Sequence, residues 1–255
     1  MIRQTKKPVF GFIAAVASSF LLAGCIIHVG ASDYEHASDY QHRYKSGNDY
    51  TSANKSVSVP DGAEADEISS TNGRVRVGDG VSASEISSNN GTVDIGDDVT
   101  ANEISSVNGK ISIGENATVN QSIEGVNGKI SIGQNAKVGK DVETVNGKIQ
   151  IDEGSEIKGK VETVNGSVDL TGTTVGKNVE TVNGSVYLRD NSHVKGDIIL
   201  SGRKKQGQDW YNKPAKIVID GSSKVDGNIV VYREVNFEFA DASLMEKVER
   251  RYESE

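Results

Sequence analysis

Several residue types are scarce in this chain, and each scarcity narrows the structures it can form. Cys25 is the single cysteine among 255 residues, so no disulfide can form within one chain. No Phe, Tyr or Trp occurs between residues 51 and 186. A core without aromatic rings must be filled by aliphatic side chains, and this suits a narrow interior. The same stretch carries no helical periodicity long enough to indicate a helix.

The first 25 residues have the layout of a secretory leader. A basic start precedes an apolar run over residues 9–22, which is too short to be a comfortable membrane span. The run ends in LLAGC, residues 21–25, which resembles the bacterial lipobox of an aliphatic residue, two small residues and cysteine. The resemblance implies a signal peptide over 1–24, cleavage before Cys25, and acyl chains (palmitate among them) on its thiol and new amino group. An ordinary secretory leader with a chance cysteine is the alternative.

The lipobox resemblance also implies a location. Several acyl chains anchor a protein firmly, whereas one chain binds only reversibly. Residue 26 is Ile rather than the Asp that retains lipoproteins of Gram-negative bacteria in the inner membrane. The resemblance therefore implies the outer membrane, with the domain facing the periplasm. Removing residues 1–24 takes away three positive charges and moves the formal net charge from -8 to -11. Such an acidic domain argues against nucleic acid as a partner.

Residues 25–56 predict a disordered tether. They are rich in Ser, Asp, Tyr, His, Asn and Gly, and ASDYEH (31–36) is followed at once by ASDYQH (37–42). Such a segment cannot bury enough apolar surface to offset the entropy of ordering it. Its histidines could bind a metal ion. Spaced polar residues without a structured second shell favour a simple tether instead.

Asn-Gly recurs at a nearly constant spacing from residue 72 to residue 184. The copies stand at 72–73, 90–91, 108–109, 127–128, 146–147, 165–166 and 183–184, and a fixed period in this range indicates a solenoid. One unit reads VETVNGKIQIDEGSEIKGK (142–160), in which Ile149 and Ile151 alternate with polar residues as in a β-strand. Asn-Gly suits a positive φ, so each copy is expected to turn a corner there. Three short strands and three corners per unit predict one coil of a single-stranded parallel β-helix, an all-β fold.

Stacked coils place like residues over like residues, about 4.8 Å apart. One coil cannot offset its own ordering entropy, whereas a stack can. The repeat predicts four aliphatic ladders inside the solenoid. The first is Ile68, Ile86, Ile104, Ile123, Val142, Val161, Val179 and Ile198; the second is Val75, Val93, Ile111, Ile130, Ile149, Val168 and Val186; the third is Val77, Ile95, Ile113, Ile132, Ile151, Leu170 and Leu188; the fourth is Val81, Val99, Val119, Val138, Ile157, Val175 and Val194.

The repeat predicts about nine such coils within a solenoid over residues 57–239. An insertion at 201–216 interrupts them. Residues 240–255 are expected to form a short capping helix, with Asp241 or Ser243 at its N-terminus. This helix would cover the open strand edges of the last coil. Its apolar side would carry Leu244, Met245, Val248 and Tyr252.

The coil text over 138–189 follows the rhythm V-x-G-x-[VI]-x-x-[VN]-G-x-[VI]-x-[VI]. It resembles bactofilin domains, which are short-coil β-helices that polymerise into filaments, and the repeat domains grouped as auto-transporter adhesin head or GIN-like. The resemblance extends over residues 60–235 and rests on periodicity, which unrelated solenoids share. Bactofilins usually lack a lipobox, and this chain adds a long tether, a basic loop and a cap. The resemblance implies a structural role or self-assembly.

Two classes of β-helical enzyme fit the sequence less well. Hexapeptide acyltransferases would need six-residue frames, which fail at Thr144, and a catalytic histidine, for which His193 is the one candidate in the solenoid. Polysaccharide lyases and hydrolases would need a local cluster of carboxylates. The sequence instead predicts a regular acidic row, which is typical of a solvated face, and a cation bound along it is the functional alternative. The row consists of Glu124, Glu143, Glu162 and Glu180, with Lys140, Lys160 and Lys177 placed to screen it.

The insertion is the clearest local exception to the repeat. Arg203, Lys204 and Lys205 precede Trp210 and Tyr211. Aromatic and basic groups together suit a glycan or an anionic polymer. Packing of Trp210 against the solenoid is the alternative, and it is favoured because a lone Trp is highly buried on average.

The sequence therefore predicts a non-enzymatic lipoprotein that serves as a structural or interaction module of the cell envelope. Its expected partners are the membrane, through lipid on Cys25, an envelope protein or glycan, and a second copy of itself. No catalytic residue, cofactor or metal is expected. A self-assembling, bactofilin-like scaffold is the first alternative, and a carbohydrate-active enzyme is the second.

Overall fold

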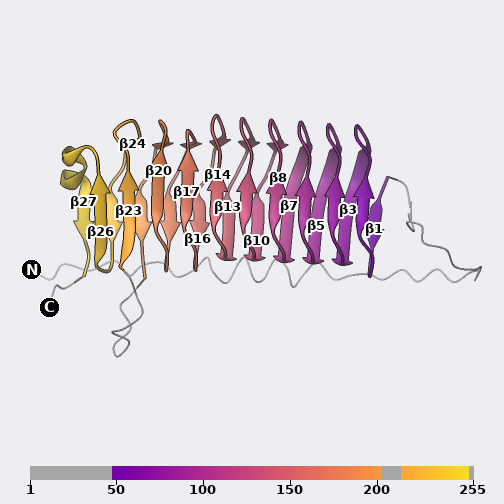
Figure 1. Cartoon of the computed structure of the whole chain (residues 1–255), viewed down its shortest axis with the longest axis horizontal. Helices are drawn as coiled ribbons and strands as arrows, with labels where there is room; N and C mark the ends of the chain where they lie inside the picture. The colour runs from indigo at the N-terminus through magenta and orange to yellow at the C-terminus, as the bar shows by residue number, and fades with distance from the viewer. Residues whose placement is uncertain (1–47, 203–213, 253–255) are drawn as a thin grey trace, which may run out of the picture. The chain divides into compact units, whose positions relative to one another are not determined.

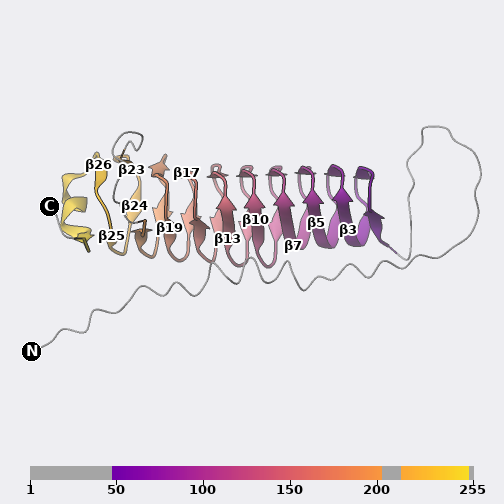
Figure 2. The same ribbon diagram turned by 90° about the horizontal axis from the view of Figure 1, so that it is seen from below.

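The computed structural model describes residues 48–202 and 214–252. Within these residues the chain is a parallel β-solenoid of ten coils with almost no helix (Figure 1). Each coil adds one strand to a ten-stranded sheet and one or two strands to a seventeen-stranded sheet. Figure 2 shows the same stack after a quarter turn, with the coils in regular succession along one axis. The predicted fold class is confirmed, with one coil more than the repeat count indicated.

The two sheets, called sheet B and sheet A, form the walls of the solenoid. Sheet B contains β2 (Val57–Val59), β4 (Val75–Val77), β6 (Val93–Ile95), β8 (Ile111–Ile113), β11 (Ile130–Ile132), β14 (Ile149–Ile151), β17 (Val168–Thr171), β20 (Val186–Arg189), β23 (Ala215–Ile219) and β26 (Val235–Phe239). Sheet A contains β1 (Tyr50–Ser52), β3 (Glu64–Asn72), β5 (Ser82–Asn90), β7 (Thr100–Asn108), β9 (Thr118–Val119), β10 (Ile123–Asn127), β12 (Lys137–Val138), β13 (Val142–Asn146), β15 (Glu156–Ile157), β16 (Val161–Thr163), β18 (Thr174–Val175), β19 (Val179–Thr181), β21 (His193–Val194), β22 (Ile198–Leu200), β24 (Lys224–Val225), β25 (Ile229–Val231) and β27 (Val248–Arg250).

Three of the four predicted ladders are confirmed by the strand register. The ladder from Ile68 to Ile198 runs through sheet A without a slip. The ladders that start at Val75 and Val77 run side by side through sheet B. Their members are almost completely buried, and each contributes about 1.5–3 kcal/mol of gross burial. The core is therefore a column of aliphatic side chains between two sheets.

The fourth predicted ladder is wrong at its first two members, Val81 and Val99. Val119 pairs with Ala101, and Ala101 pairs with Ala83. Val99 takes the position two residues earlier in the coil, which Ala117 occupies in the following coil. The hydrogen bonds show this equivalence: Thr118 N–H donates to the Val99 carbonyl, and the same bond in the next coil goes to the Ala117 carbonyl. The large and small side chains have exchanged places between these coils. The summed side-chain volume of the two positions inside the solenoid is unchanged. The valines keep a regular spacing in the sequence, so the sequence does not reveal the shift.

The repeat becomes one residue longer at a single corner. In β7 the chain runs from Ala101 to Ile104 as one continuous strand. In the next coil the equivalent residues are Val119 and Ile123, one residue further apart, and the strand is divided into β9 and β10. The extra residue creates the third corner, which later coils keep.

The Asn-Gly copies form corners as predicted, but positive φ is not the reason. The positive-φ residues lie at the other end of sheet B, at Gly62, Gly80 and their equivalents in later coils. At the Asn-Gly corners a Cβ on Gly109 or Gly147 would come closer than 3.0 Å to the carbonyl of the glycine one coil below. Glycine is required there because the backbones of adjacent coils approach too closely for a side chain.

Two predicted boundaries need correction. β1 pairs with β3 inside the range expected to be tether, with Tyr50 over Ile68. At the other end, residues 240–252, the described part of the expected capping helix, do not form an α-helix. A six-residue 3-10 helix, η1 (Ala242–Lys247), begins after the predicted cap Asp241 and is followed by β27. The helix is limited to this one short segment because the chain must return to sheet A, where β27 pairs with β25.

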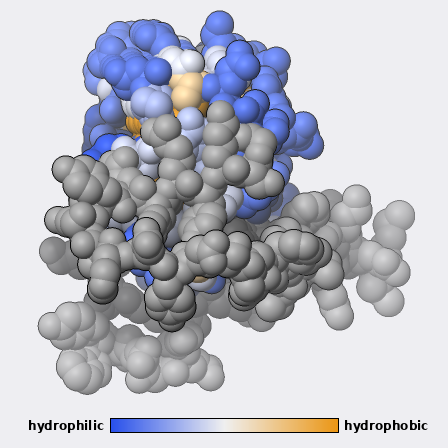
Figure 3. All heavy atoms as spheres, turned by 90° about the vertical axis from the view of Figure 1, so that its right-hand side faces the viewer, coloured by the Kyte–Doolittle hydropathy of each residue, from blue (hydrophilic) through white to orange (hydrophobic). Residues whose placement is uncertain are grey.

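Apolar residues cover the C-terminal end of the bore. Leu244 of η1 is 7% exposed, whereas Met245, expected on the same side, is 41% exposed. Phe237 and Phe239 of β26 pack on the last coil with their ring centroids 5.4 Å apart. Rings are accommodated here because no further described coil has to stack on them. Figure 3 views the opposite, β1 end, where hydrophobic atoms show in the middle of the end face between hydrophilic sides.

Candidate functional site

The predicted site residues all lie outside the described residues. They are Cys25 and the insertion residues Arg203, Lys204, Lys205, Trp210 and Tyr211. The structure describes where the insertion joins the fold. It leaves after Leu200, the end of β22 in sheet A, and returns at Ala215, the start of β23 in sheet B. The insertion therefore replaces a corner between the two sheets, at the place where other coils carry Asn-Gly.

The acidic row predicted on sheet A is confirmed by the register. Glu124, Glu143, Glu162 and Glu180 occupy one position in successive coils. Each of them is partly buried. Carboxylates this close repel each other, so the row needs a cation or shares protons.

Lys160 supplies the cation in the middle of the row. Its ammonium lies 2.7 Å from a Glu143 carboxylate oxygen and also bonds Glu162. All three side chains are less than one-fifth exposed. Burial acts against the charged form, but the hydrogen bonds to the two carboxylates outweigh it and raise the pKa of Lys160. Of the three lysines predicted to screen the row, Lys160 is the one with ion pairs in the described structure.

The acidic surface continues toward the N-terminal end, which the predicted row did not include. Glu67, Glu85 and Glu103 form a second row, on the other side of the ladder isoleucines from the first. Burial and then the charges of Glu67 and Glu103 raise the pKa of Glu85. Burial also raises the pKa of Glu124, with Glu103 contributing, so the two rows interact. The repeated motif EISS, in which a glutamate directly precedes the ladder isoleucine, could have predicted this second row from the sequence.

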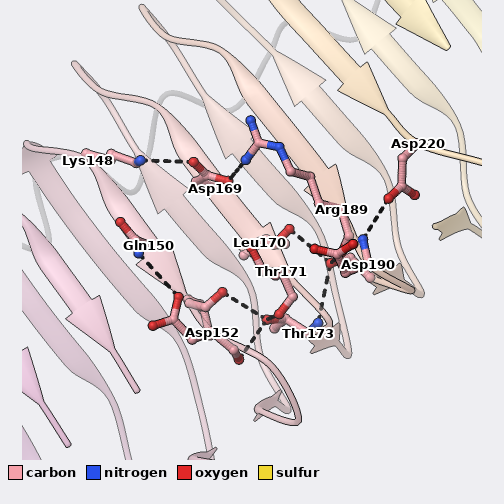
Figure 4. A network of polar contacts seen from close by, with 12 residues as sticks. Lys148, Gln150, Asp152, Asp169, Leu170, Thr171, Thr173, Arg189, Asp190 and Asp220 are labelled. Carbon is pink, nitrogen blue, oxygen red and sulfur yellow. Dashed lines mark hydrogen bonds and ion pairs between the residues drawn. The ribbon is translucent and has the colours of Figure 1, made fainter. Parts of the chain in front are cut away.

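A second polar network lies on the outer face of sheet B (Figure 4). Lys148 donates to Asp169 at 2.9 Å, and Arg189 pairs with the other oxygen of the same carboxylate. The Arg189 guanidinium also lies 4.9 Å from the centre of the Tyr187 ring. Lys148, Asp169 and Arg189 come from three successive coils. The network therefore ties these coils together across the face.

The carboxylate of Asp220 closes a corner of the C-terminal coils. It accepts hydrogen bonds from the backbone of Asp190 at 2.7 Å, from Ser223 at 2.8 Å and from both donors of Ser222. Partial burial acts to raise its pKa, but these bonds lower the pKa of Asp220 to about 2. The carboxylate is an acceptor for backbone donors rather than a free acid or base.

His193, the one histidine among the described residues, lies beside the last coils. Its Nε2 is 2.8 Å from Asp226, whose other oxygen is 2.7 Å from the Lys224 ammonium. Lys247 of η1 donates to the carbonyls of Val225 and Asp226. The hydrogen bonds from Lys224 and His193 lower the pKa of Asp226. The bonds from Lys247 fasten η1 to the solenoid beside this cluster.

An amide ladder runs along the Asn-Gly corner. From Asn72 to Asn183, each asparagine of this corner donates its Nδ2–H to the Oδ1 of the asparagine one coil below, at 2.7–3.0 Å. Its members are Asn54, Asn72, Asn90, Asn108, Asn127, Asn146, Asn165 and Asn183. The repeated asparagine therefore has a role that the glycine beside it does not: it links coils through side chains.

Comparison of the chain with protein-family models, curated proteins and solved structures gave no match. The candidate sites therefore rest on the chain's own geometry. In residues 48–202 and 214–252, no group of three His, Cys, Asp or Glu side chains is arranged to hold a metal ion. No helix in these ranges is long and apolar enough to cross a bilayer.

Proposed function

We propose that the protein is a non-enzymatic lipoprotein whose β-solenoid serves as a structural or interaction module of the bacterial cell envelope. The observation that carries this proposal is the periodicity of the outer faces. Their charged and amide groups form rows that bond from coil to coil, as in the Asn ladder and the Glu143–Lys160–Glu162 pairing. Groups bonded in this way keep the surface flat and regular, which suits a rod that offers one of its faces to a binding partner.

The mechanism would be geometric. Ten coils at about 4.8 Å each give a rod of about 48 Å. Every coil is hydrogen-bonded to the next through both sheets, so the rod resists bending. The lipid on Cys25 would fix one end and residues 25–56 would set the reach, shortened by the few residues of β1. The insertion at 201–216 is the proposed contact with an envelope protein or glycan.

The lipobox-like LLAGC supports the lipid anchor, and Ile26 supports the outer membrane. A fractionation experiment in a Gram-negative host tests both. Wild-type chain should take up a labelled fatty acid and sediment with outer membranes. Cys25→Ala should lose the label and leave the membrane fraction. Ile26→Asp should keep the label and move to the inner membrane. Label on Cys25→Ala, or an unlabelled wild-type chain, would contradict the anchor.

A self-assembling scaffold is the second candidate. The outer edges of β1 and β2 pair with no described strand, and open strand edges can add further strands. The C-terminal end favours a discrete module instead, because Leu244 of η1 is buried over the end of the bore. Light scattering separates the two, since a scaffold grows with concentration and a discrete module does not.

A further inference from the structure

The seven Asn-Gly pairs have nearly the same sequence but differ in how the glycine nitrogen is held. In the copies at Gly73, Gly91, Gly109 and Gly128, the N–H donates to the carbonyl of the asparagine in the next coil, at 2.9–3.1 Å. Gly147, Gly166 and Gly184 make no such bond to any described group. All seven asparagines are exposed, so exposure does not distinguish them.

The cause is a change in the backbone of the later coils. β10 and β13 run as far as Asn127 and Asn146, whereas β16 and β19 end at Thr163 and Thr181. Val164 and Asn165 both donate to the preceding coil, as do Val182 and Asn183. Two successive N–H groups pointing the same way interrupt the strand alternation. The carbonyl that would accept from Gly147 or Gly166 in the coil below is therefore turned away. For Gly184 the cause is different, because the coil that follows has Gly202 in the place of the asparagine.

Asn183 differs from its neighbours in a second respect. Interior members of the amide ladder donate on one side and accept on the other. Asn183 donates to Asn165 at 2.8 Å, and its own Oδ1 accepts from no described group. It is the last member of the described ladder, so within the described residues its carboxamide is held on one side.

We propose that Asn183–Gly184 is a self-modification site, where the asparagine deamidates well ahead of the protected Asn-Gly copies. The Gly184 nitrogen gives up its proton to water or hydroxide and attacks Cγ of Asn183. The new N–Cγ bond forms, Nδ2 takes up a proton from solvent, the Cγ–Nδ2 bond breaks, and Nδ2 leaves as ammonia. Water then opens the five-membered imide to aspartate or isoaspartate. No oxidant, reductant or enzyme takes part.

The hydrogen bond at the glycine nitrogen controls the first step. A nitrogen that donates to a carbonyl must lose that bond before it can be deprotonated and rotate toward Cγ. The net contribution of one hydrogen bond corresponds to about a tenfold change in rate. The nitrogens of Gly147, Gly166 and Gly184 lack this protection. The one-sided carboxamide of Asn183 removes a second restraint.

The consequence would be local loss of register. Isoaspartate adds a methylene to the main chain, and a coil with one extra main-chain atom cannot place its ladder residues over the coil below. Val186 and Leu188 of β20, which start the coil after Gly184, would lose their register with Val168 and Leu170. The rod would open between β17 and β20, one coil before the insertion.

The chain contains its own matched controls. Asn127 and Asn146 both lie in the text VNGK, yet only Gly128 has a bonded nitrogen. Asn165 and Asn183 both lie in VNGS, yet only Asn165 has a carboxamide held on both sides. Flanking sequence therefore cannot account for a difference within either pair.

The test is peptide mapping by mass spectrometry after the folded full chain is kept in mildly alkaline buffer, with a parallel sample in concentrated urea. In the folded chain we expect Asn183 to convert first, and Asn146 to convert about tenfold faster than Asn127. In urea the members of each pair should convert at equal rates. Asn183→Gln should remove the early ammonia release, and Asn72→Gln should leave it unchanged. Equal rates within both pairs in the folded chain, or unequal rates in urea, would overturn the proposal.

Discussion

The coils before Val119 and those after it build the same core by different means. The earlier coils place valine at the corner and alanine two residues later, while the next coils place Ala117 before Val119 and Ala136 before Val138. The earlier coils also cross sheet A in one long strand, and the later ones turn a third corner. The comparison shows that the stack constrains the summed volume of a coil rather than each position.

The three copies of the hexapeptide VETVNG also differ in structure between earlier and later coils. They lie at 142–147, 161–166 and 179–184. The first copy is strand as far as Asn146, and the other two leave the strand after Thr163 and Thr181. Identical text thus has two backbone conformations, so the coil is set by its neighbours as well as by its own residues.

The largest effect is expected from a comparison of two kinds of glycine: one required by close approach of the neighbouring backbone, and one at a position of positive φ. A Cβ on Gly147 meets the backbone of Gly128, so Gly147→Ala should cost more than about 4 kcal/mol of the free energy of unfolding. Gly80 has a φ of +64° with nothing within 4 Å of a Cβ, and the equivalent position in a later coil is Asn116. Gly80→Asn should therefore change stability by less than about 1 kcal/mol. Urea unfolding followed by circular dichroism measures both, and equal costs would refute the close-approach argument.

The exchange of valine and alanine can be tested by reproducing it. Val99→Ala alone should cost about 2 kcal/mol because it leaves a cavity in the bore. Ala101→Val alone should cost about 1–3 kcal/mol through overpacking. The double variant imitates the later coils and should recover at least about 0.5 kcal/mol of the summed cost in a double-mutant cycle. Strict additivity of the two costs would mean that the positions do not share volume.

The amide ladder should contribute more in its middle than at its end. Asn108 donates to Asn90 and accepts from Asn127, whereas Asn54 only accepts within the described ladder. Asn108→Ala should cost about 1 kcal/mol of unfolding free energy, and Asn54→Ala about half of that. Thermal unfolding of the two variants measures the difference. A ladder without stabilising effect would give two variants indistinguishable from wild type.

The smallest effect is a pH dependence from the acidic rows. Burial raises the pKa values of Glu85, Glu124 and Glu180 above 4.5 in the folded chain. The folded chain then binds protons at a higher pH than the unfolded chain, so stability rises as the pH falls through these values toward 4.5 and is lost as it rises through them. Below this window the lowered pKa of Asp220 acts oppositely, and its contribution is lost as the pH falls to about 2.

Glu124→Gln should remove part of this dependence. At neutral pH the variant should gain a few tenths of a kcal/mol, because solvent still reaches this partly buried row and screens its charges. Glu64→Gln, an exposed change elsewhere on sheet A, is the control and should leave the pH profile unaltered. Parallel profiles for wild type and Glu124→Gln would contradict the raised pKa of Glu124.

The sequence is most informative where the structure repeats. Ile68, Val75 and Val77 begin ladders that can be predicted member by member, because period and alternation both constrain them. The slip at Val119 is not visible in the sequence, since a shift of two residues keeps the alternation and exchanges only side-chain size. The Asn-Gly pairs predict positive φ at the wrong corner, because the sequence carries no information on how closely the backbone of the neighbouring coil approaches the glycine.

The candidate site is less predictable for a physical reason. The row from Glu124 to Glu180 repeats with the coil, so its register follows from the period. Its continuation through Glu67, Glu85 and Glu103 changes position on the face at the coil where the period changes, and a count of residues does not reveal this. The anchor at Cys25 and the contact residues of the insertion stay predictions.

The assembly state of the protein decides whether the solenoid is a discrete rod-like module. Light scattering and negative-stain microscopy would be applied to the chain without residues 1–24, carrying Cys25→Ser and compared with the same chain ending before Asp241. We expect monomeric particles with a solenoid of about 48 Å, and larger species only after η1 and β27 are removed. Filaments from the chain with its C-terminal end intact would contradict it and identify a scaffold.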